Sequence, residues 1–254
     1  MTRTYRLARG AATMLAALLA APLAAHADVI VGAGSAVHFV DAKVDLGCGN
    51  LNVNGSADTT SATLADIASF SLSGAFMLGA GALALGSDFS NVGMFAPGTG
   101  TVMVSDACGS GTSTFSGASN FYSLSIATTT GKQAIFPIGL TQNVAHALTL
   151  QGTAENLLRI VSSTAGQQGV LALTAGTEQT IAYVDARDNR ASATPIAPGA
   201  PSLYQSVNSG DLTHWFDISV GGNASTPAPA LDRLALLLLT ALIAAFAWKR
   251  PRTS

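Results

Sequence analysis

Apolar and small polar residues alternate in short pieces along most of the chain between residues 36 and 186. A period of two is typical of a half-buried β-strand, and no part of this region keeps the 3.6-residue period of an amphipathic helix. Gly, Ser, Thr and Asn separate the pieces and supply turns. The strand-like pieces include VHFV (37–40), LNVNG (51–55), FSLSG (70–74), ALALGS (82–87), TVMVS (101–105), FYSLSIA (121–127), QAIFP (133–137), HALTLQG (146–152), LLRIVSS (157–163), VLALTAG (170–176) and TIAYVDA (180–186).

The ends of these pieces favour a coil over a series of hairpins. Several pieces have an apolar–polar–apolar core followed by glycine, and Asn54-Gly55 is the single tight hairpin signal. We therefore predict an all-β fold, a single-stranded right-handed parallel β-helix over residues 28–222. Coils of about 20–25 residues would give roughly six or seven rungs between Val37 and Asp185. The alternative is a β-sandwich or jelly roll with antiparallel strands.

The amino terminus has the pattern of a secretory signal peptide over residues 1–27. Three arginines form a positive segment, an Ala/Leu run follows over residues 11–21, and Ala25 and Ala27 flank His26 as an A-x-A cleavage site. The alternative is an uncleaved membrane anchor. The short apolar run and Pro22 favour cleavage.

The carboxyl terminus predicts a Pro-rich linker over residues 223–230 and a transmembrane helix with a basic end over residues 231–254. The apolar stretch 234–248 would form about 22 Å of helix, short against a hydrocarbon core of about 30 Å. The basic residues after it place this end in the cytoplasm and the body outside. The membrane is therefore a partner, at least in transit.

The tail resembles the IPTL-CTERM class of bacterial protein-sorting signals. A proline-leucine start, a Leu/Ala helix and a basic cluster carry the resemblance, while Ala228, Ala230 and Leu234 depart from the usual Ile, Thr and Trp. The resemblance implies an exosortase-type processing enzyme as partner, and a plain single-span anchor is the alternative. The residues assigned to the signal are Pro229, Leu231, Asp232, Arg233, Lys249, Arg250 and Arg252.

Charge restricts the partners of the exported body. Residues 28–223 contain 5 basic and 13 acidic residues, a balance of −8. This surface argues against nucleic acid and anionic lipid as ligands. Its hydroxyl and amide side chains suit an extracellular β-protein that contacts an extracellular polysaccharide or a surface matrix.

Cys48 and Cys108 predict one disulfide, because an even number of cysteines in an oxidising compartment normally pairs. Regular rungs about 4.8 Å apart would separate residues 60 positions apart by roughly 10–14 Å, whereas a disulfide needs Cα atoms within about 7 Å. Either the first coils are irregular, with Cys48 in an amino-terminal cap, or the thiols stay free. We expect the irregular cap. Metal and cofactor sites are not predicted, since the histidines lack metal-ligand spacing.

The body also resembles β-helical modules of secreted and surface-anchored bacterial proteins. The segments 45–56, 95–109, 121–139, 148–163 and 181–191, with the closing HWF (214–216), carry this resemblance. It implies adhesin-like or matrix-associated use, finally at the cell surface or outside the cell, and no chemistry.

The strongest candidate for catalysis is the segment YVDARDN (183–189), in which Asp185 and Asp188 flank Arg187. Glycoside cleavage needs two carboxyl groups across a sugar. Asp and Asn at the end of a strand are, however, typical turn residues. We therefore predict no catalytic residues and a non-enzymatic protein. A carbohydrate-active enzyme and a periplasmic structural protein are the alternatives. His214-Trp215-Phe216 is predicted to cap the final rung.

Overall fold

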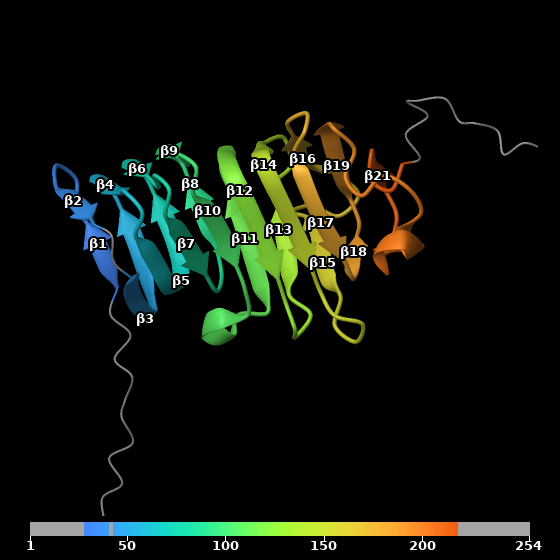
Figure 1. Ribbon diagram of the computed structural model, residues 1–254, viewed down its shortest axis with the longest axis horizontal. Helices are drawn as coiled ribbons and strands as arrows, with labels where there is room; N and C mark the ends of the chain where they lie inside the picture. The colour runs from blue at the N-terminus through green and yellow to red at the C-terminus, as the bar shows by residue number, and fades with distance from the viewer. Residues whose placement is uncertain (1–27, 41–42, 218–254) are drawn as a thin grey trace, which may run out of the picture.

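The chain winds into an all-β parallel β-solenoid of about 8 turns. The computed structural model describes residues 28–40 and 43–217. The strand ladders are parallel from one end of the solenoid to the other (Figure 1). The predicted parallel β-helix is therefore confirmed, and the antiparallel sandwich is wrong. Helix in the described part of the chain is limited to the 3-10 turns η1 (Ala107–Gly109) and η2 (Pro201–Tyr204).

Each coil contributes strands to three faces. The first face contains the starts of β3 (Lys43–Val53) and β5 (Thr63–Leu72), β7 (Ala82–Leu85), β10 (Thr101–Val104), the ends of β12 (Ser119–Ala127) and β14 (Thr141–Gln151), and β17 (Glu178–Ala182). The second face contains β1 (Val29–Val31), the ends of β3 and β5, β8 (Phe89–Asn91), β11 (Thr112–Ser116), β13 (Gln133–Phe136), β15 (Leu158–Ser162), β18 (Val184–Ala186) and β20 (Val207–Asn208). The third face contains β2 (Ala36–Phe39), β4 (Ser56–Thr59), β6 (Ala75–Met77), β9 (Met94–Ala96), the starts of β12 and β14, β16 (Gly169–Leu173), β19 (Asn189–Ala193) and β21 (Leu212–Thr213).

The core is a column of inward-facing side chains that stack from coil to coil. Phe70 lies 5.3 Å from Phe89 between ring centroids, and Phe115 and Phe136 stack at 4.8 Å. These rings are buried, as the alternation predicts, since every second residue of a strand points inward. Burial of each such ring stabilises the fold by about 2–3 kcal/mol.

The early coils repeat every 19 residues, fewer than the 20–25 expected. The Thr59 hydroxyl donates to the backbone carbonyl of Leu78, 19 residues later, and the Ser73 hydroxyl donates to Asn54 Oδ1, 19 residues earlier. This short period is possible because glycines at the corners have no side chain between stacked coils. A Cβ on Gly74 would lie 1.9 Å from the carbonyl oxygen of Gly55, so only glycine fits between the stacked corners.

The carboxyl-terminal end is closed by aromatic side chains. Trp215 pairs with Ile196 in a parallel bridge and donates its indole N–H to Asn189 Oδ1 at 3.2 Å. Trp215 and Phe216 are buried at the last described rung, and the predicted cap by His214-Trp215-Phe216 stays a prediction. His214 precedes them at a left-handed backbone position, with φ of 57°.

The two predicted targeting segments lie outside the described residues. No helix within residues 28–40 and 43–217 has the length and apolarity to cross a membrane. The signal peptide (1–27), the linker and the sorting tail (223–254) therefore stay predictions.

Candidate functional site

A polar depression on the second face brings together residues from four successive coils. Gln133 of β13 pairs in register with Arg159 of β15, which pairs with Asp185 of β18. These residues are spaced by 26, so their outward side chains form one row along the solenoid axis. With three side chains from the neighbouring outward row they line a depression of about 220 Å³, and those neighbours are Val161, Arg187 and Ser209.

The polar groups of this depression differ in how far they are already paired. The Ser209 hydroxyl donates a hydrogen bond to Asp185 Oδ1 at 2.5 Å. Arg187 Nε lies 3.3 Å from Asp188 Oδ2. Among the described ion pairs none includes Arg159, which is exposed on the outer surface. The depression therefore presents a guanidinium group that is free to meet a ligand.

The structure separates the two carboxylates of the catalytic candidate YVDARDN. Asp185 belongs to β18 and faces the depression, whereas Asp188 occupies a left-handed corner with φ of 50°. The Asp188 side chain is only 8% exposed and pairs with Arg187. Glycoside cleavage needs two carboxyl groups that both reach the scissile bond. Here one carboxylate faces the depression and the other is buried behind it.

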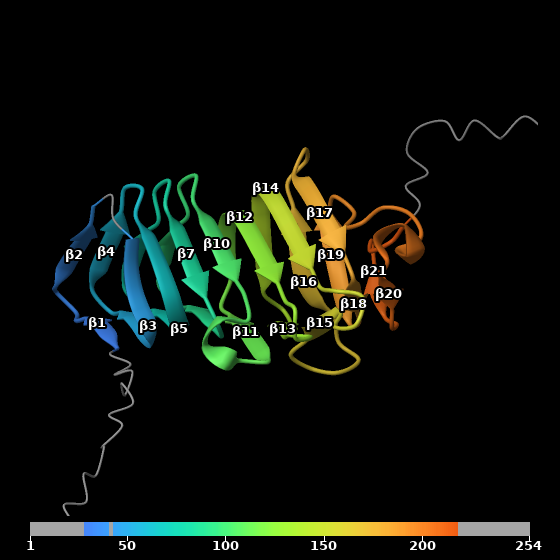
Figure 2. The same ribbon diagram turned by 60° about the horizontal axis from the view of Figure 1, so that its bottom comes forward.

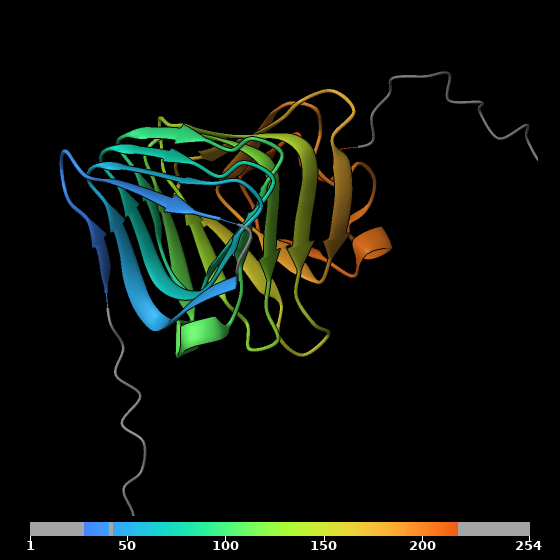
Figure 3. The same ribbon diagram turned by 60° about the vertical axis from the view of Figure 1, so that its left-hand side comes forward.

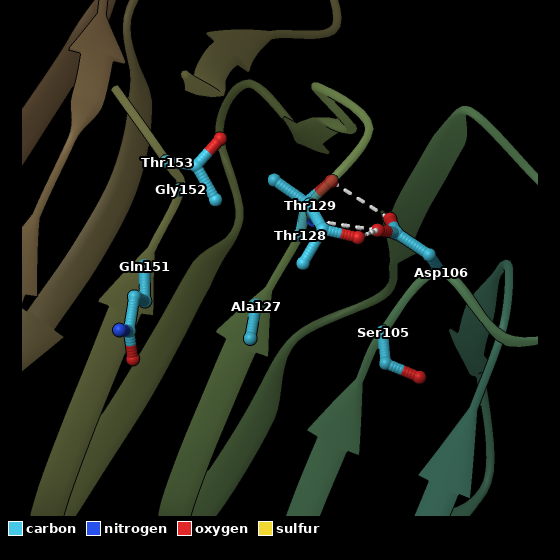
Figure 4. Close-up of a pocket in the computed structure, with 8 residues that line it drawn as sticks. All are labelled: Ser105, Asp106, Ala127, Thr128, Thr129, Gln151, Gly152 and Thr153. Carbon is cyan, nitrogen blue, oxygen red and sulfur yellow. Dashed lines mark hydrogen bonds between the residues drawn. The ribbon is translucent and has the colours of Figure 1, made fainter. Parts of the chain in front are cut away.

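A second depression, of about 360 Å³, lies where the first-face strands β10, β12 and β14 end (Figure 4). Asp106 is its ionisable residue, and Figure 4 shows its carboxylate turned toward Thr128 and Thr129. Asp106 Oδ1 accepts from the Thr128 hydroxyl at 2.7 Å, and Oδ2 accepts from the Thr129 amide at 2.6 Å. Because these bonds occupy both oxygens, Asp106 organises the corner rather than offering a free carboxylate.

Burial and hydrogen bonding act on Asp106 in opposite directions. Burial favours its neutral form, but the hydrogen bonds from the amide of Thr129 and the hydroxyls of Thr128 and Thr129 outweigh it. The pKa of Asp106 therefore lies below its ordinary value of 3.8. The Asp106 carboxylate is therefore charged at neutral pH.

Lys132 is a buried cation next to this corner. Its Nζ donates to the carbonyl oxygen of Gly86 at 2.8 Å and to that of Ser110. Burial lowers the pKa of Lys132, while the charges of Asp106 and Asp88 act in the opposite direction. Lys132 thus ties together backbone from three coils and has no access to a ligand, since the residue is fully buried.

Cys48 and Cys108 form a disulfide with Cα atoms 5.4 Å apart, so the predicted pairing is confirmed. The predicted irregularity of the first coils is present, since the ladder between β3 and β5 shifts register, but the predicted cap is not where Cys48 lies. Cys48 lies in β3, which pairs with β1 on one side and β5 on the other, and β3 shifts register between Asp45 and Gly49.

The span between the cysteines is covered by a loop that folds back over earlier coils. The loop around η1 leaves the solenoid after β10 and contacts β5, and it appears as the short green coil below the strands in Figure 2. Its Ala107 carbonyl lies over Gly86, where an added Cβ would be 2.0 Å away. The loop therefore brings Cys108 down to the coil that holds Cys48.

Within the described ranges, no three His, Cys, Asp or Glu side chains gather in a way that could hold a metal ion. His38 contacts Asp58 on the third face, and His146 stacks on Tyr122 with ring centroids 4.6 Å apart.

Sequence reasoning identified Asp185 and Arg187 but missed Gln133, Arg159 and Ser209. These residues come from separate strand pieces, and only the coil length shows that they meet. The spacing of 26 from Gln133 to Arg159 to Asp185 is a signal that could have found the row.

Comparison with protein-family models, with curated proteins and with solved structures gives no significant match to this chain.

Proposed function

We propose that this protein is an exported, non-enzymatic component of the cell surface or extracellular matrix, with an adhesin-like or structural role. The observation that best supports export is the Cys48–Cys108 disulfide. Disulfides persist in oxidising compartments and are rare in the cytosol. A bonded pair therefore agrees with the signal peptide predicted for residues 1–27.

The outer surface supports a binding role over catalysis. The polar depression on the second face holds Arg159, Gln133 and Ser209 beside Asp185, while the second carboxylate of the catalytic candidate is buried and paired. Side chains of this kind bind hydroxyl and carboxyl groups without needing a proton donor and a nucleophile on either side of a bond.

Two finer features belong to this proposal. The solenoid is right-handed, since β-strand connections between parallel neighbours are right-handed in about 98% of cases. Residues 231–254 form a transmembrane helix that holds the protein in the inner membrane until an exosortase-type enzyme processes the tail. Recognition would then depend on Pro229 and Leu231, with the terminal basic residues as the retention charges.

The decisive experiment follows the protein in its native host. We expect the intact mass of the mature protein to lack residues 1–27 and the tail from about residue 229, and we expect intact cells to be labelled by an antibody against the body. A mass that retains residues 229–254 would establish a permanent anchor. Labelling only after the outer envelope is opened would establish the periplasmic alternative.

A carbohydrate-active enzyme is the second candidate, because Asp185 faces the polar depression. A screen on acidic and neutral polysaccharides separates the two functions. We expect no new reducing or unsaturated ends. Turnover that is abolished by Asp185→Asn would instead establish an enzyme.

A further inference from the structure

The second-face depression contains a cation that the rest of the protein leaves available. Arg187 is engaged by Asp188 at 3.3 Å, and Asp185 accepts a hydrogen bond from Ser209. Arg159 lies between Gln133 and Asp185 in the outward row. No carboxylate of the described residues lies within 4.0 Å of its guanidinium group, the distance limit of an ion pair.

This position is unusual for the molecule as a whole. Residues 28–223 contain 5 basic and 13 acidic residues. One of the five, Lys132, is fully buried, and two of the remaining four line this one depression. Two arginines thus balance Asp185 and Asp188 here, whereas the body as a whole is negative, so the depression repels an anionic group less than the rest of the surface does.

The side chains around Arg159 specify more than an anion. A guanidinium group binds a carboxylate through two parallel hydrogen bonds. The Gln133 amide and the Ser209 hydroxyl can each donate and accept, and Asp185 accepts only. Asp185 would repel an anionic group placed against it but would accept a hydrogen bond from a hydroxyl. The set therefore fits a ligand that places an anionic group such as a carboxylate at Arg159 and hydroxyls at Asp185.

The dimensions of the row favour a chain over a single small molecule. The lining residues come from β13, β15, β18 and the turn after β20, which are four successive coils. At about 4.8 Å per coil, the depression extends roughly 14 Å along the solenoid axis, and the row from Gln133 to Asp185 covers about 10 Å of it. A polymer laid along the axis could place successive sugars against Gln133, Arg159 and Asp185.

We propose that the second-face depression binds the carboxylated sugar residues of an acidic polysaccharide, with Arg159 holding the carboxylate. Asp185, Ser209 and Gln133 hold the neighbouring hydroxyls. The proposal rests on the proposed function, since it names the matrix component that the exported body contacts.

The test compares one polymer in two charge states. Full-length protein is titrated with polygalacturonate and with the same polymer after full methyl esterification, in 50 mM salt. We expect binding to the free acid, at least tenfold weaker binding to the ester, and weakening of the free-acid complex by 0.5 M salt. Arg159→Gln should lower affinity for the free acid at least tenfold.

A matched variant separates the site from general charge. Arg190→Gln removes an exposed arginine from β19 on the third face, outside the depression, and should leave the affinity unchanged. Circular dichroism melting confirms that both variants fold. Equal binding of acid and ester, or an affinity that Arg159→Gln leaves intact, would overturn the proposal.

Inorganic sulfate and phosphate form the third arm. If either ion binds at Arg159 while polygalacturonate does not, the depression is a site for free anions and the polysaccharide assignment is wrong. Surface labelling of intact cells does not depend on any of these titrations. A failed titration with positive labelling would therefore overturn the ligand and leave the proposed function standing.

Discussion

The early coils (residues 43–104) and the late coils (residues 105–217) use the same three faces but differ in how the corners are built. In the early coils, the third-face strands start at Ser56, Ala75 and Met94, at intervals of 19 residues. In the late coils, the outward row from Gln133 to Asp185 advances by 26 residues per coil. Figure 3, which looks toward the amino-terminal end, shows the early coils stacked closely behind one another.

The two depressions described above lie in the late coils, while early third-face strands line a smaller depression of about 140 Å³. Corners of the early coils are so tight that a carbonyl oxygen takes the place of a side chain, as at Gly74 over Gly55. The extra residues of the late coils leave the stack as loops. Both of these depressions are lined by late-coil residues, including Asp106 and Thr128 in one and Arg159 and Asp185 in the other. Regular stacking favours stability, and the longer corners leave room for the two larger depressions.

A polar ladder shows what the tight corners achieve. Asp28 Oδ1 accepts from the Asn50 amide at 2.8 Å, Asn50 Oδ1 accepts from the Ser69 amide, and Ser69 Oγ accepts from the Asp88 amide. Asp88 Oδ1 then accepts from the Thr114 amide at 2.8 Å. Each corner side chain thus satisfies a backbone donor of the next coil, which avoids the cost of leaving that donor unpaired.

The sharpest way to break the link between early and late coils is to remove the disulfide that joins them. The Cys48→Ala/Cys108→Ala variant should lose up to about 4 kcal/mol of unfolding free energy, because the bridge closes 60 residues of chain. Urea unfolding measures the loss. Reductant should bring the wild type to the stability of the variant and leave the variant unchanged, and a wild type indifferent to reductant would contradict the prediction.

The tight stacking of the early coils predicts the next largest effect. Gly74→Ala places a methyl group 1.9 Å from the Gly55 carbonyl oxygen, so the backbone must shift, at a cost of about 3 kcal/mol. Gly111→Ala is the matched control, since its added Cβ meets no atom within 4 Å. Thermal melts of the two variants test this contrast. Equal melting temperatures of the two variants would show that the early coils accept an added methyl group as readily as the late coils do.

Lys132 supports the loop that folds back from the late coils onto the early ones. Lys132→Met keeps an unbranched side chain, one atom shorter, but leaves the carbonyls of Gly86 and Ser110 without this donor. We expect a loss of about 2 kcal/mol, measured by chemical unfolding. Lys43→Met, at an exposed position in β3, should stay within about 0.5 kcal/mol of the wild type. A neutral Lys132→Met would mean that the disulfide alone holds the loop.

The smallest effect depends on pH and concerns the corner around Asp106. Because its pKa is lowered in the folded state, Asp106 contributes stability that is complete above the unfolded pKa of about 4 and is lost as pH falls through the folded pKa. Asp106→Asn should cost about 1 kcal/mol at pH 7, and this difference should disappear at low pH.

Glu155→Gln provides the control for that measurement, because Glu155 is an exposed carboxylate of the late coils. Unfolding of both variants is followed by urea titration between pH 2 and pH 7. A difference between wild type and Asp106→Asn that stays constant over this range would rule out the charge of Asp106 as its source.

The strand pieces and their inward faces could be predicted from the sequence, because alternation follows directly from strand geometry. LLRIVSS (157–163) contains β15, and Phe70 and Phe89 face inward as expected. The positions of the corners between strands could not be predicted from the alternation. The piece TIAYVDA (180–186) is β17 and β18 on two different faces, divided at Tyr183, whose φ is 55°.

The candidate site was predicted only where its residues are neighbours in the sequence. Asp185 and Arg187 lie in one segment, but Arg159 reaches them through a coil whose length is set by loops. Loop length is tolerated over a wide range at small energetic cost, so the alternation of strands does not specify it. The early period of 19 was visible in the spacing of Phe70 and Phe89 and of Gly74 and Gly93, yet the expected period was longer.

The disulfide also restricts the number of coils between Cys48 and Cys108. Solenoids change length readily in evolution when a whole coil is duplicated or lost, because each coil contacts only its neighbours. Inserting one 19-residue coil between Cys48 and Cys108 would add about 4.8 Å along the axis to Cα atoms that are now 5.4 Å apart. The new separation would exceed the roughly 7 Å that a disulfide spans. The bridge therefore fixes the number of early coils, whereas the late coils remain free to lengthen and to vary the surface that they present.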